Sequence, residues 1–192
     1  MLNFIESQFM KNNQSKQLYF YSVGLSYKKA DAEIRGKFSL DAVAKMRLLE
    51  QAKTEGIESL IVTSTCNRTE IYGFAEHPFQ LIKLICENSQ GSVEAFQKYG
   101  FVYKNKEAVG HLFRVGTGLD SQILGDFEII SQIKTSFFQA KSVNLVNAFQ
   151  ERLINAVIQA SKKIKTDTEI SSGATSVSFA SVQYILNNVE EI

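Results

Sequence analysis

The first hundred residues alternate between short apolar segments and longer segments with helical spacing, and this alternation constrains the fold more than any other feature. Apolar, aromatic and β-branched residues predict strands over residues 19–26, 58–63, 71–75 and 101–104. Apolar residues at helical spacing predict helices over residues 40–54, capped by Ser39, and over residues 78–88. The order strand-helix-strand-strand-helix-strand predicts an antiparallel sheet with two helices on one face.

From residue 107 onward the sequence changes to amphipathic helical patterns. The predicted helices of this part cover residues 107–116, 127–142, 145–165 and 182–189. The whole chain is therefore predicted to belong to the α+β class, with a ferredoxin-like β-α-β-β-α-β antiparallel sheet followed by a helical subdomain.

Charge and composition exclude several classes of protein. The net charge is +1, from 21 basic and 20 acidic residues, whereas proteins that coat nucleic acid are usually far more basic. Any contact with nucleic acid must come from a local patch, for which the lysine-rich segments 1–40 and 141–165 are candidates; solvated lysines on helix faces are the alternative. No apolar run approaches the roughly 20 residues of a membrane span, and no secretory signal is visible. We expect a cytoplasmic protein with reduced thiols.

Cys66 lies where a predicted buried strand runs into a polar turn, which is a usual place for a positioned side chain. Its neighbours Thr65, Asn67 and Arg68 offer hydrogen-bond donors and a guanidinium. A nearby cation favours the thiolate, which is the nucleophilic form of cysteine. The alternative is a small apolar residue at the end of a strand. Cys86, flanked by apolar residues on a predicted helix, is expected to fill the core.

The chain has two histidines, of which His77 is expected to be exposed in a loop. His111 is either a half-buried helix histidine bonded to a backbone carbonyl or a proton acceptor for Cys66. Two histidines and two separated cysteines argue against a zinc site. Residues 116–121 begin like a dinucleotide fingerprint, but they follow a helix and lack the third glycine, so no nucleotide-binding unit is predicted.

The string Ser64-Thr-Cys-Asn-Arg-Thr-Glu70 resembles the signature of the glutamyl-tRNA reductase family. Further stretches resemble that family in the same order, and they cover residues 24–30 with 34–35, 111–115 with 118–125, and 168–178. Together the resemblance extends over about residues 18–185. Several motifs in the same order are more specific than any one of them. They favour a functional role for Cys66 and His111 over the purely structural alternatives.

The resemblance implies NADPH-dependent conversion of glutamyl-tRNA(Glu) to glutamate-1-semialdehyde, the first step of tetrapyrrole (porphyrin and haem) biosynthesis. It implies that Cys66 is the catalytic nucleophile that forms a thioester and releases tRNA, and that His111 is the catalytic histidine important for activity. Arg68 would offer its planar donors to the substrate carboxylate. The substrate-binding positions implied by the resemblance are Thr65, Asn67, Arg68, Ser121, Asp126, Phe127, Glu128 and Gln132.

Two segments depart from the family pattern. The chain has Ser26-Tyr-Lys-Lys-Ala30 where the family usually has Asn-His-Lys-Thr-Ala, and Asp126-Phe-Glu128 where it has Glu-Pro-Gln, although Gln132 matches. Residues 1–17 are expected to form a flexible tail, residues 18–168 the catalytic domain, and residues 169–192 a linker and the start of an NADPH-binding domain.

With no NADPH-binding residues expected in this chain, it should lack reduction and retain an esterase activity. By resemblance, the full-length enzyme is expected to be a homodimer that passes its product to the downstream aminomutase, and this chain to be a monomer. Two other functions stay open. A non-catalytic tRNA-binding or regulatory ferredoxin-like module would have an inert Cys66. A cysteine hydrolase would pair Cys66 with His111 and show no glutamyl preference.

Overall fold

The computed structural model describes residues 17–168, 170 and 177–188 of the 192-residue chain. The strands are β1 (Tyr19–Ser26), β2 (Leu60–Ser64), β3 (Arg68–Ala75) and β4 (Phe101–Lys104). The helices are α2 (Ala32–Lys37), α3 (Ala42–Thr54), α4 (Pro78–Asn88), α5 (Val93–Tyr99), α6 (Lys106–Gly116), α7 (Glu128–Ser142), α8 (Ala148–Asp167) and α9 (Val177–Asn188).

The four strands form one antiparallel sheet in the order β2-β3-β1-β4. β3 lies between β1 and β2, and β1 lies between β3 and β4, so each strand-helix-strand unit is split by a strand of the other. Val23 of β1 pairs with Ile71 on one side and with Val102 on the other. The predicted α+β class and the antiparallel sheet are confirmed.

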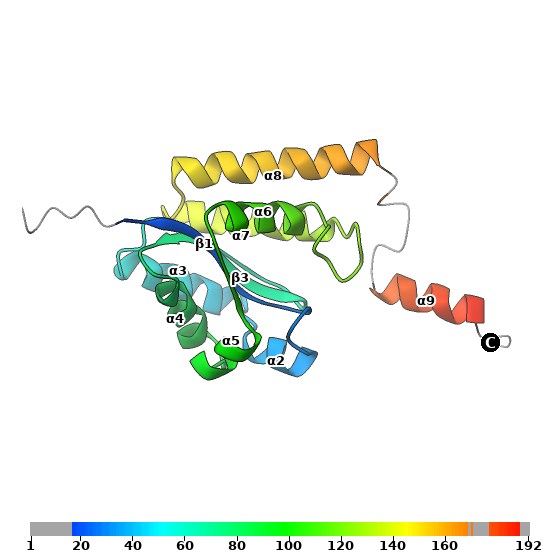
Figure 1. Cartoon of the computed structure of the whole chain (residues 1–192), viewed down its shortest axis with the longest axis horizontal. Coiled ribbons are helices and arrows are strands. Elements are labelled where there is room, and N and C mark those ends of the chain that lie inside the picture. Colours follow the sequence, from blue (N-terminus) through cyan, green and yellow to red (C-terminus); the bar gives the residue numbers. More distant parts are fainter. Residues whose placement is uncertain (1–16, 169, 171–176, 189–192) are drawn as a thin grey trace, which may run out of the picture.

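Helices cover both faces of the sheet (Figure 1). α3, α4 and α5 contact the strands on one face, while α6 contacts β1 and β4 and α7 contacts β2 on the other. α8 packs outside α6 and α7 and forms an outer layer. The helices α6, α7 and α8 therefore form the cover of the second face. Burial on both faces explains why β1, β2 and β3 are buried at nearly every position, whereas the edge strand β4 alternates between half-buried and exposed residues.

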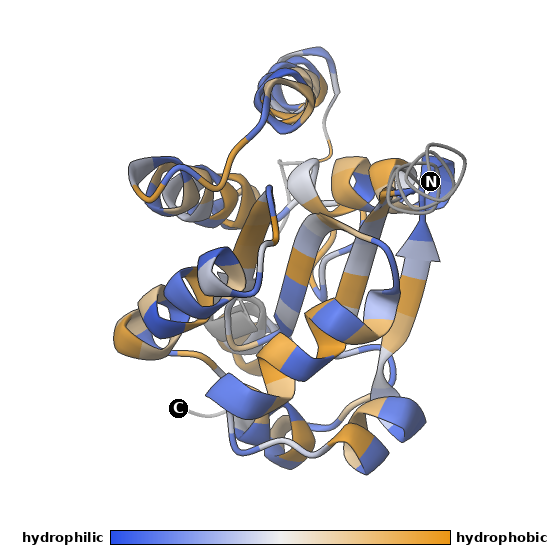
Figure 2. Ribbon diagram, turned by 90° about the vertical axis from the view of Figure 1, so that its left-hand side faces the viewer, coloured by the Kyte–Doolittle hydropathy of each residue, from blue (hydrophilic) through white to orange (hydrophobic). Residues whose placement is uncertain are grey.

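Hydrophobic residues run along the strands and the flanking helices (Figure 2), and they form one core. Phe149 of α8 packs against Phe20 of β1 and Phe74 of β3, with ring centroids 5.4 Å apart in each pair. This aromatic cluster ties the outer helix to the sheet. No helix in the described part of the chain has both the length and the apolar character needed to cross a membrane.

Some predicted boundaries were wrong. α3 begins at Ala42 and not at residue 40, because the side chain of Asp41, not that of Ser39, accepts the capping hydrogen bond from Ala44 N–H. β3 begins at Arg68 and not at residue 71. The short helices α2 and α5 were not predicted, and α9 begins before residue 182. The predicted tail, residues 1–17, lies outside the described residues except for residue 17, as does part of the predicted linker, residues 169–192.

Gly24 allows β1 to approach the part of β3 that holds the polar groups discussed below. It pairs with Glu70, and a Cβ atom at Gly24 would lie 2.3 Å from Thr69 O and 2.8 Å from Glu70 Cγ. Thr69 O and Glu70 Cα, which would also lie 2.8 Å away, are backbone atoms and cannot give way. Only glycine fits at this position without moving β3.

Gly24→Ala is therefore expected to lower the free energy of unfolding by about 1–3 kcal/mol, the usual cost of overpacking. Gly36→Ala is the matched control, because a Cβ at Gly36, in α2, meets nothing within 4 Å. That substitution should be neutral or slightly stabilising, since alanine favours helix. Urea denaturation of the two variants measures the difference; equal stabilities would contradict the close approach at Gly24.

Candidate active site

The turn between β2 and β3 presents Cys66. The Thr65 hydroxyl oxygen accepts hydrogen bonds from the backbone N–H groups of Asn67 (3.1 Å) and Arg68 (3.2 Å). The backbone of Thr65 also donates to Arg68 O at 2.8 Å. Arg35 of α2 donates through Nε to Cys66 O at 2.9 Å. These bonds fix the turn from both sides and leave the Cys66 side chain exposed.

A cavity of about 60 Å³ lies where this turn meets the chain between α6 and α7 and the first turns of α7. All the predicted site residues except His111 and Phe127 line it. Gln122 and Ile129 also line it and were not predicted, although Gln122 follows Ser121 directly and Ile129 lies three residues before Gln132 on α7. The complete lining is Thr65, Cys66, Asn67, Arg68, Ser121, Gln122, Asp126, Glu128, Ile129 and Gln132.

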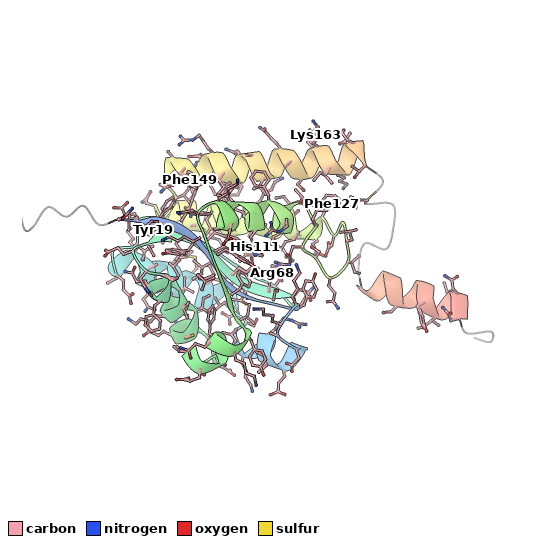
Figure 3. All side chains as sticks on the ribbon, viewed as in Figure 1. Tyr19, Arg68, His111, Phe127, Phe149 and Lys163 are labelled. Carbon is pink, nitrogen blue, oxygen red and sulfur yellow. The ribbon has the colours of Figure 1, made fainter. Side chains whose placement is uncertain are left out.

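Phe127 and His111 have other surroundings. Phe127 directly precedes α7 (Figure 3), and Lys165 Nζ of α8 lies 5.7 Å from its ring centroid. His111, on α6, is buried at 3% exposure, and its Nε2 lies 3.0 Å from Glu70 Oε2. Among the described residues, His111 Nδ1 has no hydrogen-bond partner. The structure therefore does not bring His111 into a hydrogen bond with Cys66, as a nucleophile–base pair would require.

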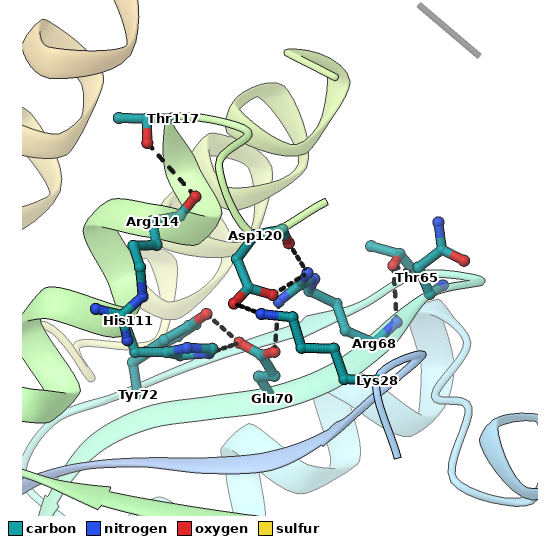
Figure 4. A network of polar contacts seen from close by, with 10 residues as sticks. Lys28, Thr65, Arg68, Glu70, Tyr72, His111, Arg114, Thr117 and Asp120 are labelled. Atoms are coloured by element: carbon teal, nitrogen blue, oxygen red, sulfur yellow. Dashed lines mark hydrogen bonds and ion pairs between the residues drawn. The ribbon is translucent and has the colours of Figure 1, made fainter. Parts of the chain in front are cut away.

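Arg68, Glu70 and Tyr72 follow one another at every second position of β3, so their side chains lie on the same face of the strand. Arg68 Nη1 donates to Glu70 Oε1 at 2.7 Å, and both side chains are almost fully buried. The Tyr72 hydroxyl donates to Glu70 Oε2 (Figure 4). The two carboxylate oxygens of Glu70 are thus shared between an arginine at the cavity and a tyrosine and a histidine away from it.

Asp120, in the segment after α6, holds Arg68 from the other side. Arg68 Nη2 donates to Asp120 O and to Asp120 Oδ1, the latter at 3.2 Å (Figure 4). Lys28 pairs with the remaining oxygen, Asp120 Oδ2. Burial raises the pKa of Asp120, but the hydrogen bond from Lys28 and the charge of Arg68 outweigh it, and the pKa is lowered. The guanidinium is therefore fixed between two carboxylates before any substrate binds.

Charge and hydrogen bonding also set the state of Glu70. Burial alone would raise its pKa, but the Arg68 guanidinium and the hydrogen bonds with His111 and Tyr72 outweigh it and lower the pKa. Burial, together with the Glu70 carboxylate, raises the pKa of Tyr72 well above its ordinary value. Glu70 is therefore the ionised acceptor and Tyr72 the neutral donor.

The second cysteine differs from Cys66. Cys86 is half-buried on α4, and burial with the nearby carboxylates of Glu94 and Glu87 raises the pKa of its thiol to about 11. At neutral pH it is a protonated, poorly nucleophilic thiol. Cys66, in contrast, is exposed and lines the cavity.

The described residues do not fit an NADPH site. Every strand pair in the sheet is antiparallel, so the described part lacks the parallel β-α-β unit that places a dinucleotide pyrophosphate. Gly116 has a packing role instead, because a Cβ there would lie 2.3 Å from Val157 Cγ1 of α8. Within these residues, no group of three or more His, Cys, Asp or Glu side chains is arranged to hold a metal ion.

The buried ion pairs make stability depend on pH. Because the pKa of Glu70 is lowered by folding, its stabilising contribution is complete above the ordinary value of 4.5 and is lost as pH falls below it. Glu70→Gln is expected to cost about 3–5 kcal/mol at pH 7, since it leaves Arg68 short of a counter-charge. It should also weaken the loss of stability between pH 5 and about pH 3. Urea denaturation of both proteins across this range measures the effect; parallel pH profiles would contradict it.

Comparison with known proteins gives a consistent result. The family model for the glutamyl-tRNAGlu reductase N-terminal domain matches residues 23–168. A glutamyl-tRNA reductase of Flavobacterium psychrophilum is 74% identical over 184 residues, which are 95% of this chain and 45% of the relative. One from Sulfurihydrogenibium sp. is 37% identical over 171 residues, 86% of this chain and 39% of the relative.

The solved structure of glutamyl-tRNA reductase from Methanopyrus kandleri matches with a TM-score of 0.70 at 26% identity, covering 88% of this chain and 39% of that one. The chain thus spans less than half the length of these relatives. The family model and the sequence identities agree with the ordered motifs around Cys66 and His111. This chain belongs to the glutamyl-tRNA reductase family, and it contains the family's N-terminal domain.

Proposed function

We propose that this domain performs the acyl-transfer step of glutamyl-tRNA reduction, with Cys66 as the nucleophile. The observation that carries the proposal is the cavity itself: an exposed thiol and a fixed guanidinium share one small space with polar side chains. Burial and its two carboxylate partners make Arg68 a rigid donor, whose remaining N–H groups can bind a hydrogen-bond acceptor in the cavity.

The step would proceed as an ordinary acyl transfer. The Cys66 thiolate attacks the ester carbonyl carbon that links glutamate to the tRNA ribose, and a carbon–sulfur bond forms. The carbon–oxygen bond to the ribose then breaks, and the ribose oxygen leaves with a proton as a hydroxyl group. If water attacks the resulting thioester, the carbon–sulfur bond breaks and free glutamate and the thiol are produced. This hydrolysis is the esterase activity expected of the chain.

The charges of the cavity complement a glutamyl group. The substrate side chain is a carboxylate, which Arg68 can bind, and its α-ammonium group is a cation. Asp126 and Glu128, from the start of α7 and the segment before it, supply two carboxylates to the lining. Arg68 is already paired with Glu70 and Asp120, so its remaining N–H groups would bind the substrate. A substrate carboxylate would accept a charge-assisted hydrogen bond from them and a glutaminyl amide oxygen a weaker neutral one, which favours glutamyl-tRNA.

The remaining parts of the function concern the whole enzyme. Bound in the complete protein, NADPH would supply the hydride for reduction of the thioester; the residues that the structure describes in this chain do not fit that cofactor. The proposal also includes glutamyl-tRNA as the partner, a cytoplasmic location, a homodimer for the full-length enzyme with a monomer for this chain, and transfer of the product to the downstream aminomutase.

Of the two other candidate functions, the cysteine hydrolase loses support, since His111 Nε2 contacts Glu70 and Nδ1 has no partner. The binding module is tested together with the proposal, because it requires an inert Cys66.

Incubation of the 192-residue chain with radiolabelled glutamyl-tRNA is expected to release glutamate and to leave acid-stable label on the protein that hydroxylamine removes. Cys66→Ser should abolish the label and lower release by about 10³-fold or more, since it removes the nucleophile. Cys86→Ser is the matched control and should keep both signals. Folded wild type that binds tRNA without label or release would favour the binding module.

A further inference from the structure

Glu70 lies between Arg68 and His111, to which the family resemblance gives a substrate-binding and a catalytic role. Its side chain is 0% exposed. Oε1 accepts from Arg68 Nη1, and Arg68 lines the cavity beside Cys66. Oε2 lies 3.0 Å from His111 Nε2 and also accepts from the Tyr72 hydroxyl. Glu70 is thus the residue through which His111 is connected to the cavity (Figure 4).

The chemistry of a carboxylate fixes the direction of the histidine bond. An ionised carboxylate only accepts hydrogen bonds, so the bond to Oε2 requires a hydrogen on His111 Nε2. In the neutral imidazole, Nδ1 is then a bare acceptor. Nδ1 is buried and has no partner within the part of the chain that the structure describes. An N–H at this position would be a buried donor without an acceptor, which adds a desolvation cost. The surroundings therefore select the Nε2–H tautomer.

Packing leaves the His111 ring little freedom to turn. The Phe101 and Tyr103 rings of β4 lie 4.8 and 5.0 Å from its centroid. The Tyr72 ring lies 6.4 Å away at an interplanar angle of 28°. Since aromatic side chains from two strands confine the ring, its orientation is set by packing, and its tautomer is the property that Glu70 controls.

We propose that Glu70 is a positioning residue of this site, which holds His111 as the Nε2–H tautomer and Arg68 at the cavity wall. His111 then acts on the cavity through Glu70 and Arg68, and not as the proton acceptor of Cys66. The inference deepens the proposed function and rests on it for its catalytic meaning. The His111 tautomer and the contacts from His111 through Glu70 to Arg68 can be tested without any glutamyl substrate.

The tautomer is measured by long-range ¹H–¹⁵N correlation on the ¹⁵N-histidine-labelled chain, with His77→Asn to assign the two histidines. Asparagine can keep the capping bond that His77 makes to Phe79 N–H. The expected wild-type result is the Nε2–H pattern for His111. An Nδ1–H pattern would overturn the proposal, and this measurement needs no variant of the buried network.

Glu70→Gln gives the sharpest contrast. The glutamine carbonyl must accept from Arg68, so its amide NH₂ faces His111 and donates, and the imidazole proton is expected to move to Nδ1. Tyr72→Phe is the matched control, since it removes a hydrogen bond to the same oxygen but keeps the carboxylate, and it should keep Nε2–H. An unchanged tautomer in folded Glu70→Gln would count against the proposal.

Whether His111 acts through Glu70 and Arg68 or directly on Cys66 is tested by the pH dependence of iodoacetamide alkylation at Cys66. Mass spectrometry of the separate cysteine peptides measures the alkylation rate. His111→Asn is expected to leave the Cys66 profile within about twofold of wild type. A clearly slowed or shifted profile would show that His111 is the proton acceptor and would overturn the proposal.

The glutamyl-tRNA assay then distinguishes failure of the proposed acyl-transfer function from failure of the positioning role of Glu70. If the proposal holds, His111→Asn and Glu70→Gln each raise KM about tenfold or more, and the double variant is not additive, because both changes act through Arg68. Additive effects would oppose the shared route. Absence of turnover in wild type with the Nε2–H tautomer intact would remove the proposed function and leave the role of Glu70 in the geometry standing.

Discussion

The ion pairs of Arg68 with Glu70 and Asp120 are the interaction on which the rest of the site depends. They join β3 to the segment after α6, and through Lys28 they include the segment that follows β1. A buried guanidinium is tolerated only when its donors are satisfied and its charge is balanced. These elements must therefore assemble together before the cavity beside Cys66 has its shape.

Much of the architecture could be predicted from the sequence because its signals are local and periodic. The strand pattern around residues 19–26 and the apolar spacing of residues 145–165 gave the sheet and the long helix. What could not be predicted was the placement of the later helices over the second face of the sheet, since amphipathic spacing shows that a helix is covered but not by what. The cap of α3 was misassigned because Ser39 and Asp41 are both good capping residues.

The sequence predicted residues that lie at the site, but not the hydrogen bonds and ion pairs that join them. The motif around Cys66 and residues from Ser121 to Gln132 meet in one cavity, while their binding of a substrate stays a prediction. Arg68 was expected to be a free donor, and the structure shows it paired on two sides. One part of this was accessible from the sequence, because Arg68 and Glu70 are two residues apart on a strand and so share a face. The contribution of Asp120, 52 residues away from Arg68, depends on tertiary packing.

The close pairing of Gly24 with Glu70 also restricts how β1 and β3 can align. A shift of β1 by one residue would turn its side chains to the opposite faces of the sheet. A shift by two would bring Ser22 or Ser26 to the position of Gly24, where a Cβ meets the β3 backbone. Gly24 thus specifies the pairing register of β1 and β3. Because the same register leaves room for Glu70, correct pairing of the two strands also places the buried groups of the site.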